Sequence, residues 1–446
     1  QSPYFGYDTE TTGLDYPVDR AFGFSTATPD GKKEYYDIRQ EPDAIEKINR
    51  QMRSYNGTII CHNASFDYRM SHTSGIILPL QNLDDTVIRA TQVNEHEFSY
   101  ALDDLCKKYL GEEKVSTIYS DLAALFGGLA TRNVQMPNLK HAPPEMVRPY
   151  AEKDPLLALL LWEWQQEEIE RQGLQAICRF ERDKMPTFIR AEMRGIRVDL
   201  DYAEEAMNAI TPFIKEEQQK LNKFAGWEFN SNSSPQIKKL FEPEQNKAGT
   251  WIANDGTPVG TTASGNPSFK ADYLREMSHP AAASILQIRS LLKTRDTFLL
   301  KHVIGHAHDG RVYPTINQSK GEEGGTGTGR LSYQGPAMQQ IPSRNKKVAA
   351  VVKPCFLPEL GQVWVDADMA SFEVRVFAHL INNPEIIQAY LDDPTLDLHQ
   401  FVADISGLVR NAEYSGQANA KQMNLSMIFN SGDGAIAAKM GMPFTW

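Results

Sequence analysis

Two carboxylates, Asp8 and Glu10, stand one residue apart at the end of an apolar stretch in FGYDTETTGLD. The apolar residues before them predict a buried strand. Because side chains alternate along a strand, both carboxylates point to one face, with Thr9 on the other. Like charges on one face repel each other unless a cation lies between them. An exposed acidic face is the simpler interpretation, and a site at the strand end of an open sheet is the alternative.

Bulk composition indicates a globular chain with two or three domains. The 446 residues are 41% hydrophobic, which is enough for several cores. No apolar stretch approaches the length of a membrane span, so we expect a cytosolic protein without a membrane partner. The net charge of -11 gives no general attraction to nucleic acid, so such binding would need a local basic patch. The four cysteines form no C-x-x-C pair, which argues against a zinc site and predicts buried thiols.

Two later segments add further carboxylates. IICHNASFDYRM predicts a strand over residues 58–61 that runs through a polar turn into a helix, with Asp67 at the start of that helix. RPYAEKDPLLALLLW places Tyr150 and Asp154 four residues apart, on one helical face. A hydrogen-bonded surface pair is the simpler interpretation of these two. Pro155 lacks a backbone donor, so we expect a kink next to Asp154.

Together, the four acids predict a metal site. Asp8, Glu10, Asp67 and Asp154 would repel one another, and divalent cations would relieve that repulsion. Oxygen ligands suit Mg²⁺ or Mn²⁺ rather than zinc. Two such ions would activate a water and stabilise the leaving oxygen of a phosphodiester, with Tyr150 orienting the attacking water.

The spacing of these residues resembles that of the DEDD superfamily of 3'-5' exonucleases, in its tyrosine-bearing branch. The three motifs are D-x-E at Asp8, N-x-x-x-D ending at Asp67, and Y-x-x-x-D ending at Asp154. The resemblance implies an α/β, RNase H-like fold with a mixed five-stranded sheet. It also makes all four acids metal ligands and Tyr150 a catalytic residue.

A basic stretch lies far from these acids. Residues 324–358 contain no Asp or Glu, and the stretch begins with GGTGTGRLSYQ, which is rich in Gly, Ser and Thr. Its cations are Arg330, Arg344, Lys346, Lys347 and Lys353. Backbone N–H groups and hydroxyls are accessible to phosphate oxygens in such a segment. The stretch therefore predicts either a basic surface loop or a phosphate-binding segment.

A second acidic pair occurs in QVWVDADMASFEVRVFAHL. The alternation of Val363 and Val365 predicts a buried strand that leads to Asp366 and Asp368, followed by a helix that carries Glu373. A turn pair is the alternative interpretation of the two aspartates.

The order of segments from TGRLSYQ onward resembles the family A DNA polymerases. DMASFEVR corresponds to motif A and AKQMNLSMIF to the fingers helix of motif B. The resemblance makes Asp368 a catalytic, metal-binding aspartate. It implies these DNA-binding residues before motif A: Arg330, Gln339, Arg344 and Asn345. It implies these nucleotide-binding residues: Met369, Glu373, His399, Gln417, Lys421, Leu425 and Phe429.

Three of these positions depart from the family pattern. Gln417 stands where the family usually has arginine, Leu425 replaces the usual aromatic residue, and Phe429 replaces a common tyrosine. We therefore expect sugar selection and nucleotide affinity to be the properties in which this chain differs most from the family.

The resemblance predicts four parts: an RNase H-like 3'-5' exonuclease domain followed by a partial polymerase right hand made of thumb, palm part and fingers part. The bounds that we expect for these parts are 1–172, 173–310, 311–380 and 381–446. No His-Asp-Glu stretch typical of motif C follows Phe429. We therefore expect a truncated or split polymerase, completed by a second polypeptide that carries motif C.

The expected cofactor is Mg²⁺ or Mn²⁺, with two ions per active site. The expected partners are a DNA primer-template, dNTPs and a processivity factor, in the cytoplasm of a bacterial or phage-infected host cell. An exonuclease whose polymerase portion only holds DNA is one alternative. A DNA-binding subunit with vestigial sites is another.

Overall fold

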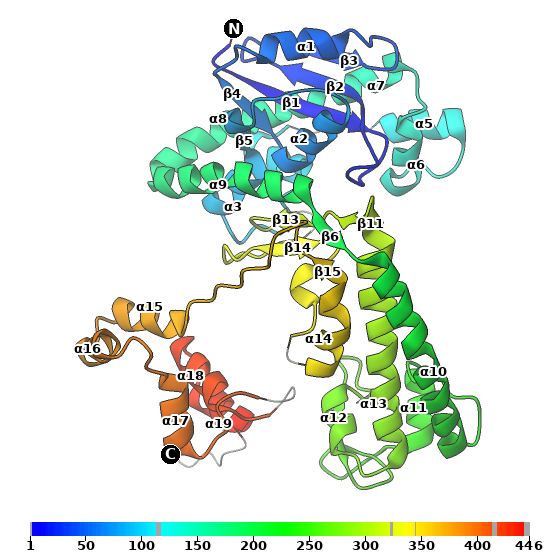
Figure 1. Ribbon diagram of the computed structural model, residues 1–446. Helices are drawn as coiled ribbons and strands as arrows, with labels where there is room; N and C mark the ends of the chain where they lie inside the picture. The colour runs from blue at the N-terminus through cyan, green and yellow to red at the C-terminus, as the bar shows by residue number, and fades with distance from the viewer. Residues whose placement is uncertain (1, 113–116, 322–323, 344, 413–416, 441–446) are drawn as a thin grey trace. The chain divides into compact units, whose positions relative to one another are not determined.

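The computed structural model describes residues 2–112, 117–321, 324–343, 345–412 and 417–440 (Figure 1). The chain forms two compact units. Unit 1 comprises Gln1–Ala203, Phe298–Ile341 and Pro354–Leu357. Unit 2 comprises Glu204–Thr297, Pro342–Lys353 and Pro358–Trp446.

Unit 1 is built on a mixed sheet, which has five strands within the described residues. Its strands are β1 (Tyr4–Thr11), β2 (Ala21–Ala27), β3 (Lys33–Asp37), β4 (Thr58–Cys61) and β5 (Leu83–Asp85). The order is β3-β2-β1-β4-β5, where β1, β4 and β5 are parallel, and β2 is antiparallel to both β1 and β3. This confirms the predicted α/β class, the mixed five-stranded sheet and the strand over residues 58–61.

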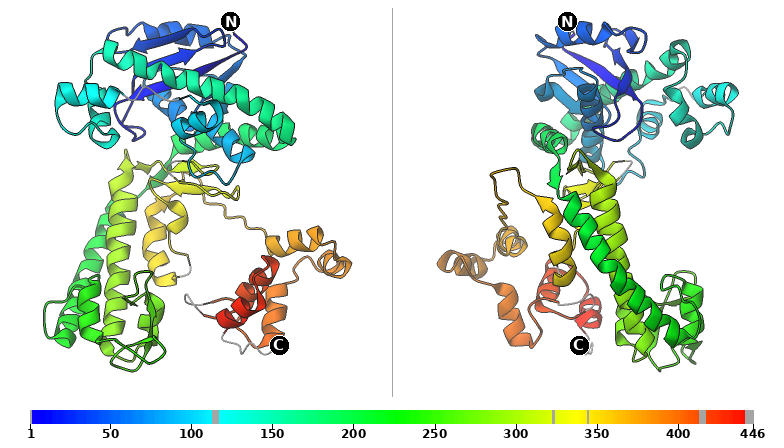
Figure 2. Two further views of the ribbon diagram at one scale, coloured as in Figure 1. Left: turned by 180° about the vertical axis from the view of Figure 1, so that it is seen from behind. Right: turned by 45° about the vertical axis from the view of Figure 1, so that its right-hand side comes forward.

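The helices of unit 1 flank this sheet. They are α1 (Ala44–Met52), α2 (Ala64–Thr73), η1 (Leu80–Asn82), α3 (Thr86–Val93), α4 (Leu102–Leu110), α5 (Ile118–Phe126), α6 (Arg132–Leu139), α7 (Pro144–Ala151), α8 (Lys153–Gln172) and α9 (Gln175–Arg194). Figure 2, left, shows the long helix α8 crossing the sheet on the side away from the viewer of Figure 1.

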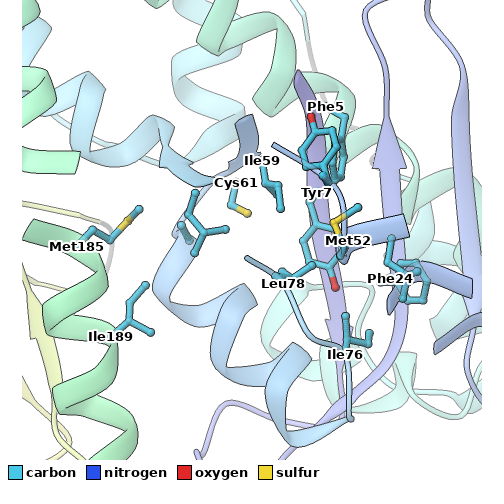
Figure 3. Close-up of a cluster of buried hydrophobic side chains, with 14 of the residues drawn as sticks. Phe5, Tyr7, Phe24, Met52, Ile59, Cys61, Ile76, Leu78, Met185 and Ile189 are labelled. Carbon is cyan, nitrogen blue, oxygen red and sulfur yellow. The ribbon is translucent and has the colours of Figure 1, made fainter. Parts of the chain in front are cut away.

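One face of β1 packs on α1, α2 and α9. Phe5 and Tyr7 of β1 belong to a buried cluster with Ile59 of β4 and with Met185 and Ile189 of α9 (Figure 3). These apolar side chains are nearly or completely removed from solvent. Because side chains alternate, Thr9 continues this face of the strand.

The other face of β1 meets α8 at a glycine. A Cβ atom on Gly6 would lie 2.0 Å from the carbonyl oxygen of Pro155, so only glycine allows the strand and the helix to approach this closely. Asp8 and Glu10 follow Gly6 with the strand period of two, and they therefore point to the face that α8 covers.

The predicted kink is present as a break between α7 and α8. Glu152 lies between the two helices, and Pro155 is in the first turn of α8, where no backbone N–H has an intrahelical acceptor. The carbonyl of Ala151, which Pro155 cannot bond, accepts a hydrogen bond of 2.8 Å from Ser25 Oγ of β2. Tyr150 and Asp154 therefore lie on two successive helices, not on one helix as the spacing predicted.

Unit 1 also contains smaller elements from later in the chain. They are β6 (Ile196–Val198), η3 (Ile304–His306), β11 (Ala307–His308), β12 (Arg311–Val312), β13 (Thr315–Asn317), β14 (Ser332–Gln334), η4 (Met338–Gln340) and β15 (Phe356–Leu357). Strands β13 and β14 form an antiparallel pair, with Ile316 opposite Tyr333. The basic stretch of residues 324–358 begins in the connection between these two strands.

Unit 2 contains the remaining elements, apart from three that cross the boundary between the units. Its elements are α11 (Ser234–Phe241), β7 (Glu244–Gln245), β8 (Trp251–Ile252), β9 (Pro258–Thr261), β10 (Pro267–Ser268), α12 (Ala271–Glu276), α13 (Pro280–Leu292), α14 (Lys346–Val352), α15 (Phe372–Leu380), α16 (Pro384–Asp392), α17 (Leu398–Ser406), α18 (Ala420–Ile428) and α19 (Asp433–Met440). The crossing elements are α10 (Leu200–Ala225), the π-helix η2 (Lys293–Val303) and η5 (Lys353–Cys355).

The strand predicted at Val363 and Val365 is not formed. Residues 362–369 have no regular secondary structure, and both valines are largely exposed. A strand needs a neighbour for its N–H and C=O groups, and no described segment pairs with this one. The helix predicted after Asp368 is present as α15, and Glu373 lies in its first turn.

The cysteines and the lengths of the helices bear on two further predictions. All four cysteines are free and buried, as the scattered spacing predicted. None of the helices in the described ranges is long and apolar enough to cross a lipid bilayer.

Candidate functional site

A cavity of about 360 Å³ in unit 1 brings most of the first acidic set together. Asp8 and Glu10 line it from β1, Tyr150 from the end of α7 and Asp154 from the first turn of α8. The close packing of Gly6 on Pro155 explains this arrangement, since it sets the first turn of α8 beside the two carboxylates of β1. Glu10 and Asp154 are almost completely buried.

Asp67 takes a different position from the other three acids. It lies in α2, on the opposite face of β1, and its Oδ1 accepts hydrogen bonds from the backbone N of Thr9 (3.1 Å) and from Thr9 Oγ1 (2.7 Å). The β1–β4 register covers only Tyr4–Gly6, so beyond Gly6 the edge of β1 can bond a side chain instead of β4. Asp67 is not among the residues that line the cavity, but it lies close enough to Asp85 and Asp154, which do, for their charges to act on it.

Burial changes the acidity of the carboxyl groups around the cavity. Loss of solvent raises the pKa of Asp67 to about 8, with smaller contributions from the charges of Asp85 and Asp154, although the Thr9 hydrogen bonds oppose this. Burial likewise raises the pKa of Asp85 to about 6. A cation near these groups would favour their ionised forms.

Tyr150 is a neutral phenol at this site. Burial raises its pKa well above the usual value, and the charges of Asp154 and Glu10 raise it further. Its hydroxyl can therefore donate or accept a hydrogen bond but cannot serve as a phenolate base.

Asp85 is a cavity residue that was not predicted from the sequence. Its side chain caps α3 by accepting from Val87 N (2.8 Å) and also accepts from Ala64 N (2.8 Å) and Asn63 N (3.1 Å) at the start of α2. One carboxylate therefore fixes two helix starts beside the cavity. The only sequence signal for it is an Asp before a Thr at a strand end, which is common at helix starts.

The carboxylates of Asp8, Glu10 and Asp154 suit a divalent cation that prefers oxygen ligands. His62 also lines the cavity, but its ring nitrogens lie 2.8 Å from Thr86 Oγ1 and 3.1 Å from the carbonyl oxygen of Tyr100. Among the residues that the structure describes, no three such side chains already converge at ligand distances. The carboxylates of Asp8, Glu10 and Asp154 would have to draw together around an ion.

We expect the charge of Asp67 to reduce stability as the pH rises. Its pKa is 3.8 in a model peptide and about 8 in the fold, so between these values the folded chain binds more protons than the unfolded chain. The contribution of Asp67 to stability is therefore complete near pH 4 and falls until about pH 8. Asp67→Asn keeps the acceptor for Thr9 but cannot ionise. In EDTA, its melting temperature minus that of the parent chain should increase from about pH 5 to about pH 8.

Asp85 titrates in both chains, and its charge adds to the difference only through its interaction with Asp67. Mg²⁺ should reduce the difference at high pH, because a cation stabilises the ionised carboxylate. A difference in melting temperature that stays constant with pH would contradict the assigned burial of charge at Asp67.

A hairpin from later in the chain forms part of the cavity wall. Thr315, Asn317 and Gln334 of β13 and β14 line it. Glu192 of α9 holds this hairpin, because its Oε1 accepts from the backbone N of Ile316 at 2.6 Å.

Glu192 is itself anchored by two residues of α2. Its Oε2 accepts a short hydrogen bond from Ser65 Oγ and lies 3.5 Å from Arg69 Nε. The carboxylate is buried, so these contacts compensate for the loss of its solvent. Nothing in the residue spacing predicts this contact between α2, α9 and β13.

Part of the predicted nucleotide-binding set gathers on α17 and α18 in unit 2. His399 of α17 is buried, and its Nδ1 lies 2.9 Å from Asn424 Nδ2 of α18. The amide nitrogen can only donate, so neutral His399 carries its proton on Nε2. Burial lowers the pKa of His399, and the nearby charge of Lys421 lowers it further. Asn424 was not among the predicted residues, although it lies one helical turn after Lys421.

The other predicted residues of unit 2 lie in the irregular segment before α15, within α18 or next to α18. Asp368 and Met369 are exposed in the extended segment before α15. Leu425 is half-buried in α18, and Phe429 is its exposed C-cap. Gln417 precedes α18, and its carbonyl accepts from Asn419 Nδ2 at 2.9 Å.

The predicted DNA-binding residues are distributed over both units. In unit 1, Arg330 is exposed between β13 and β14, and the Gln339 amide bonds both the N and the O of Tyr333 in β14. In unit 2, Asn345 is the N-cap of α14. Arg344 lies outside the described residues.

Comparison with known families gives two matches that together span most of the chain. Residues 1–170 match the family described as 3'-5' exonuclease. Residues 200–445 match DNA polymerase family A.

Curated relatives extend this similarity to nearly the full chain. The DNA polymerase DpoZ of Vibrio phage phiVC8 is 57% identical, with the alignment covering 99% of this chain and 72% of that protein. The DpoZ proteins of Salmonella phage PMBT28 and Acinetobacter phage SH-Ab 15497 are 48% and 47% identical, over 98% and 100% of this chain and 71% and 73% of theirs.

A solved structure shares the fold. It is the POL domain of Pol1 from M. smegmatis in complex with DNA primer-template and dNTP, with a TM-score of 0.74 and 20% sequence identity. The match covers 99% of this chain and 70% of that one.

Proposed function

Since this chain belongs to DNA polymerase family A and has a 3'-5' exonuclease domain, we propose that the cavity beside β1 is its exonuclease site. The observation that carries this proposal is the set of Asp8, Glu10, Tyr150 and Asp154 around one cavity. Asp8, Glu10 and Asp154 would act there as metal ligands. Asp67, on which the charge of Asp154 acts, would complete the set, and its bond to Thr9 would hold the end of β1 in place.

Enzymes of this kind use divalent metal ions, and we propose two Mg²⁺ or Mn²⁺ ions at this site. When bound, they would supply positive charge to the scissile phosphodiester and acidify the attacking water. The neutral Tyr150 hydroxyl would orient that water. The hairpin held by Glu192 would confine the 3' end of the DNA against the carboxylates, with Asn317 and Gln334 offering amide groups to the strand.

For DNA synthesis, we propose that Asp368 is a catalytic metal ligand and that α17 and α18 contact the incoming dNTP. Lys421 would offer a cation to the triphosphate. His399, neutral at physiological pH, would donate from Nε2 and would not act as a second cation. Met369, Glu373, Gln417, Leu425 and Phe429 would form the rest of the nucleotide site.

We further propose that Arg330, Gln339, Arg344 and Asn345 contact the primer-template through phosphates rather than bases. The parts 1–172, 173–310, 311–380 and 381–446 remain our proposed exonuclease, thumb, palm and fingers segments. A second polypeptide with motif C and a processivity factor remain predictions, as does a location in the cytoplasm.

One assay tests both activities. The purified chain is incubated with a 5'-labelled primer on a template and Mg²⁺, with and without dNTPs, and with and without a candidate polypeptide that carries motif C. We expect shortening without dNTPs in every case. Asp368→Ala should abolish any lengthening and leave shortening unchanged. If only shortening occurs under every condition, the alternative of an exonuclease with a DNA-holding portion is favoured.

A further inference from the structure

A second cavity of about 360 Å³ in unit 1 shares no lining residue with the exonuclease cavity. It is bordered by the start of β4, by β5 and α3, and by one face each of α8 and α9. Trp162, Gln166 and Ile169 recur with helical spacing on α8, and Gln175, Cys178, Arg179 and Arg182 recur likewise on α9. The lining is therefore a continuous surface made by two adjacent helices.

The lining carries an excess of positive charge. Arg89 of α3 and Arg179 and Arg182 of α9 border the cavity, and Asp84 of β5 is its one acidic lining residue within the described chain. Asp84 is already engaged, since its Oδ2 accepts from Trp162 Nε1 at 2.8 Å and lies 3.6 Å from Arg89 Nε. Outside the lining, exposed Asp183 lies 3.8 Å from Arg182 Nε.

Arg89 is the central group of this surface. It is only 7% exposed, and its guanidinium carbon lies 5.0 Å from the centre of the Trp162 ring. Its Nη1 is buried without a hydrogen-bond acceptor in the part of the chain that the structure describes. A buried charged donor that makes no hydrogen bond is costly, so the position calls for an acceptor from outside the protein.

The electrostatics of Arg89 agree with an anionic acceptor. Burial lowers its pKa, and the positive charge of Arg182 lowers it further, while Asp84 opposes this. An anion between the guanidinium groups of Arg89 and Arg182 would favour the charged form of Arg89 and offset both the burial and the repulsion by Arg182.

We propose that this cavity binds a phosphate group, either as inorganic phosphate or as a phosphate monoester such as a nucleoside 5'-monophosphate. Guanidinium groups bind tetrahedral phosphate oxygens through paired N–H donors, and Arg89 and Arg182 present such donors from two helices. The amides of Gln166 and Gln175 supply further donors at the rim. The volume is in the range of small-molecule sites, of about 300 Å³ and above.

Calorimetric titration of the full chain in EDTA tests this proposal. Without metal ions the carboxylates of the exonuclease cavity repel anions, so binding there is suppressed. We expect saturable binding of inorganic phosphate and of deoxyadenosine 5'-monophosphate. Arg182→Gln should weaken it by about tenfold or more, because it removes a charged hydrogen-bond donor.

Arg190→Gln is the matched control, since Arg190 is an exposed arginine on the same helix that does not line the cavity. The Arg190→Gln variant should bind inorganic phosphate with the affinity of the parent chain. Because loss of buried Arg89 can disturb folding, Arg89→Lys and the exposed Arg179→Gln serve as further variants, with the melting temperature as the folding check.

Tighter binding of the nucleotide than of inorganic phosphate would identify a monophosphate ligand, and equal binding would identify free phosphate. Both results support the proposal. Absence of saturation at about 1 mM ligand, or unchanged binding in Arg182→Gln, would overturn it. Neither result would affect the proposed exonuclease site, because the two cavities have no residue in common.

Discussion

Asp8→Ala is expected to lower the rate of 3'-end removal by about a hundredfold or more, because charge stabilisation by the site is the largest contribution to such a reaction. Asp8 lines the cavity from the same face of β1 as Glu10. Loss of either would remove a ligand for a metal ion, while the buried core on the opposite face of the strand is untouched. The measurement is the initial rate of shortening of a 5'-labelled single strand with Mg²⁺.

Asp15→Ala is the matched control, because Asp15 is an exposed acid that follows the same strand and does not line the cavity. The Asp15→Ala variant should shorten the labelled strand at the rate of the parent chain. Tyr150→Phe should lose less activity than Asp8→Ala, since it removes only a neutral hydroxyl. If Asp8→Ala shortens the strand as fast as the parent chain, the exonuclease site is assigned to the wrong cavity.

Gly6→Ala is expected to have the largest effect on stability. Its Cβ would lie 2.0 Å from the carbonyl oxygen and 2.8 Å from the carbonyl carbon of Pro155, so backbone must move. α8 cannot shift easily, because Leu157, Ala158 and Leu161 are buried in its core cluster. Overpacking of this kind costs about 1–3 kcal/mol, and the displaced α8 would also move Asp154 away from Asp8.

Urea denaturation and the shortening assay measure the two effects of Gly6→Ala together. Gly327→Ala is the control, since a Cβ there would meet only the Glu95 carbonyl oxygen at 3.8 Å, an ordinary contact. A parental denaturation midpoint for Gly6→Ala would show that β1 and α8 do not pack as described.

The arginine cavity and the wall of the exonuclease cavity were not predictable from residue spacing. Arg89 and Arg182 are 93 positions apart and lie on ordinary amphipathic helices, where arginine is usually solvated. Glu192 meets the backbone of Ile316 across 124 positions. Such contacts depend on how helices are seated on the sheet, and no local pattern carries that information.

The sequence by itself determined the features that depend on local chemistry. The apolar residues before Asp8 determined the strand, and the alternation of side chains along a strand determined the shared face of Asp8 and Glu10. The missing N–H of Pro155 determined a break next to Asp154, and the motif order determined the family. These features need only neighbours within a few residues, or motifs that remain in order along the chain.

The tertiary structure decided which face of β1 each acid meets. Gly6 lets α8 approach one face, so Asp154 joins Asp8 and Glu10, whereas α2 covers the other face and sets Asp67 on Thr9. It also decided that the stretch around Val363 is not a strand, although its alternation is typical of one. The physical reason is the same in each case. The pattern of side chains along a segment indicates whether it suits a strand or a helix and which of its faces is apolar. Its hydrogen-bond partners and packing contacts come from segments distant in the chain.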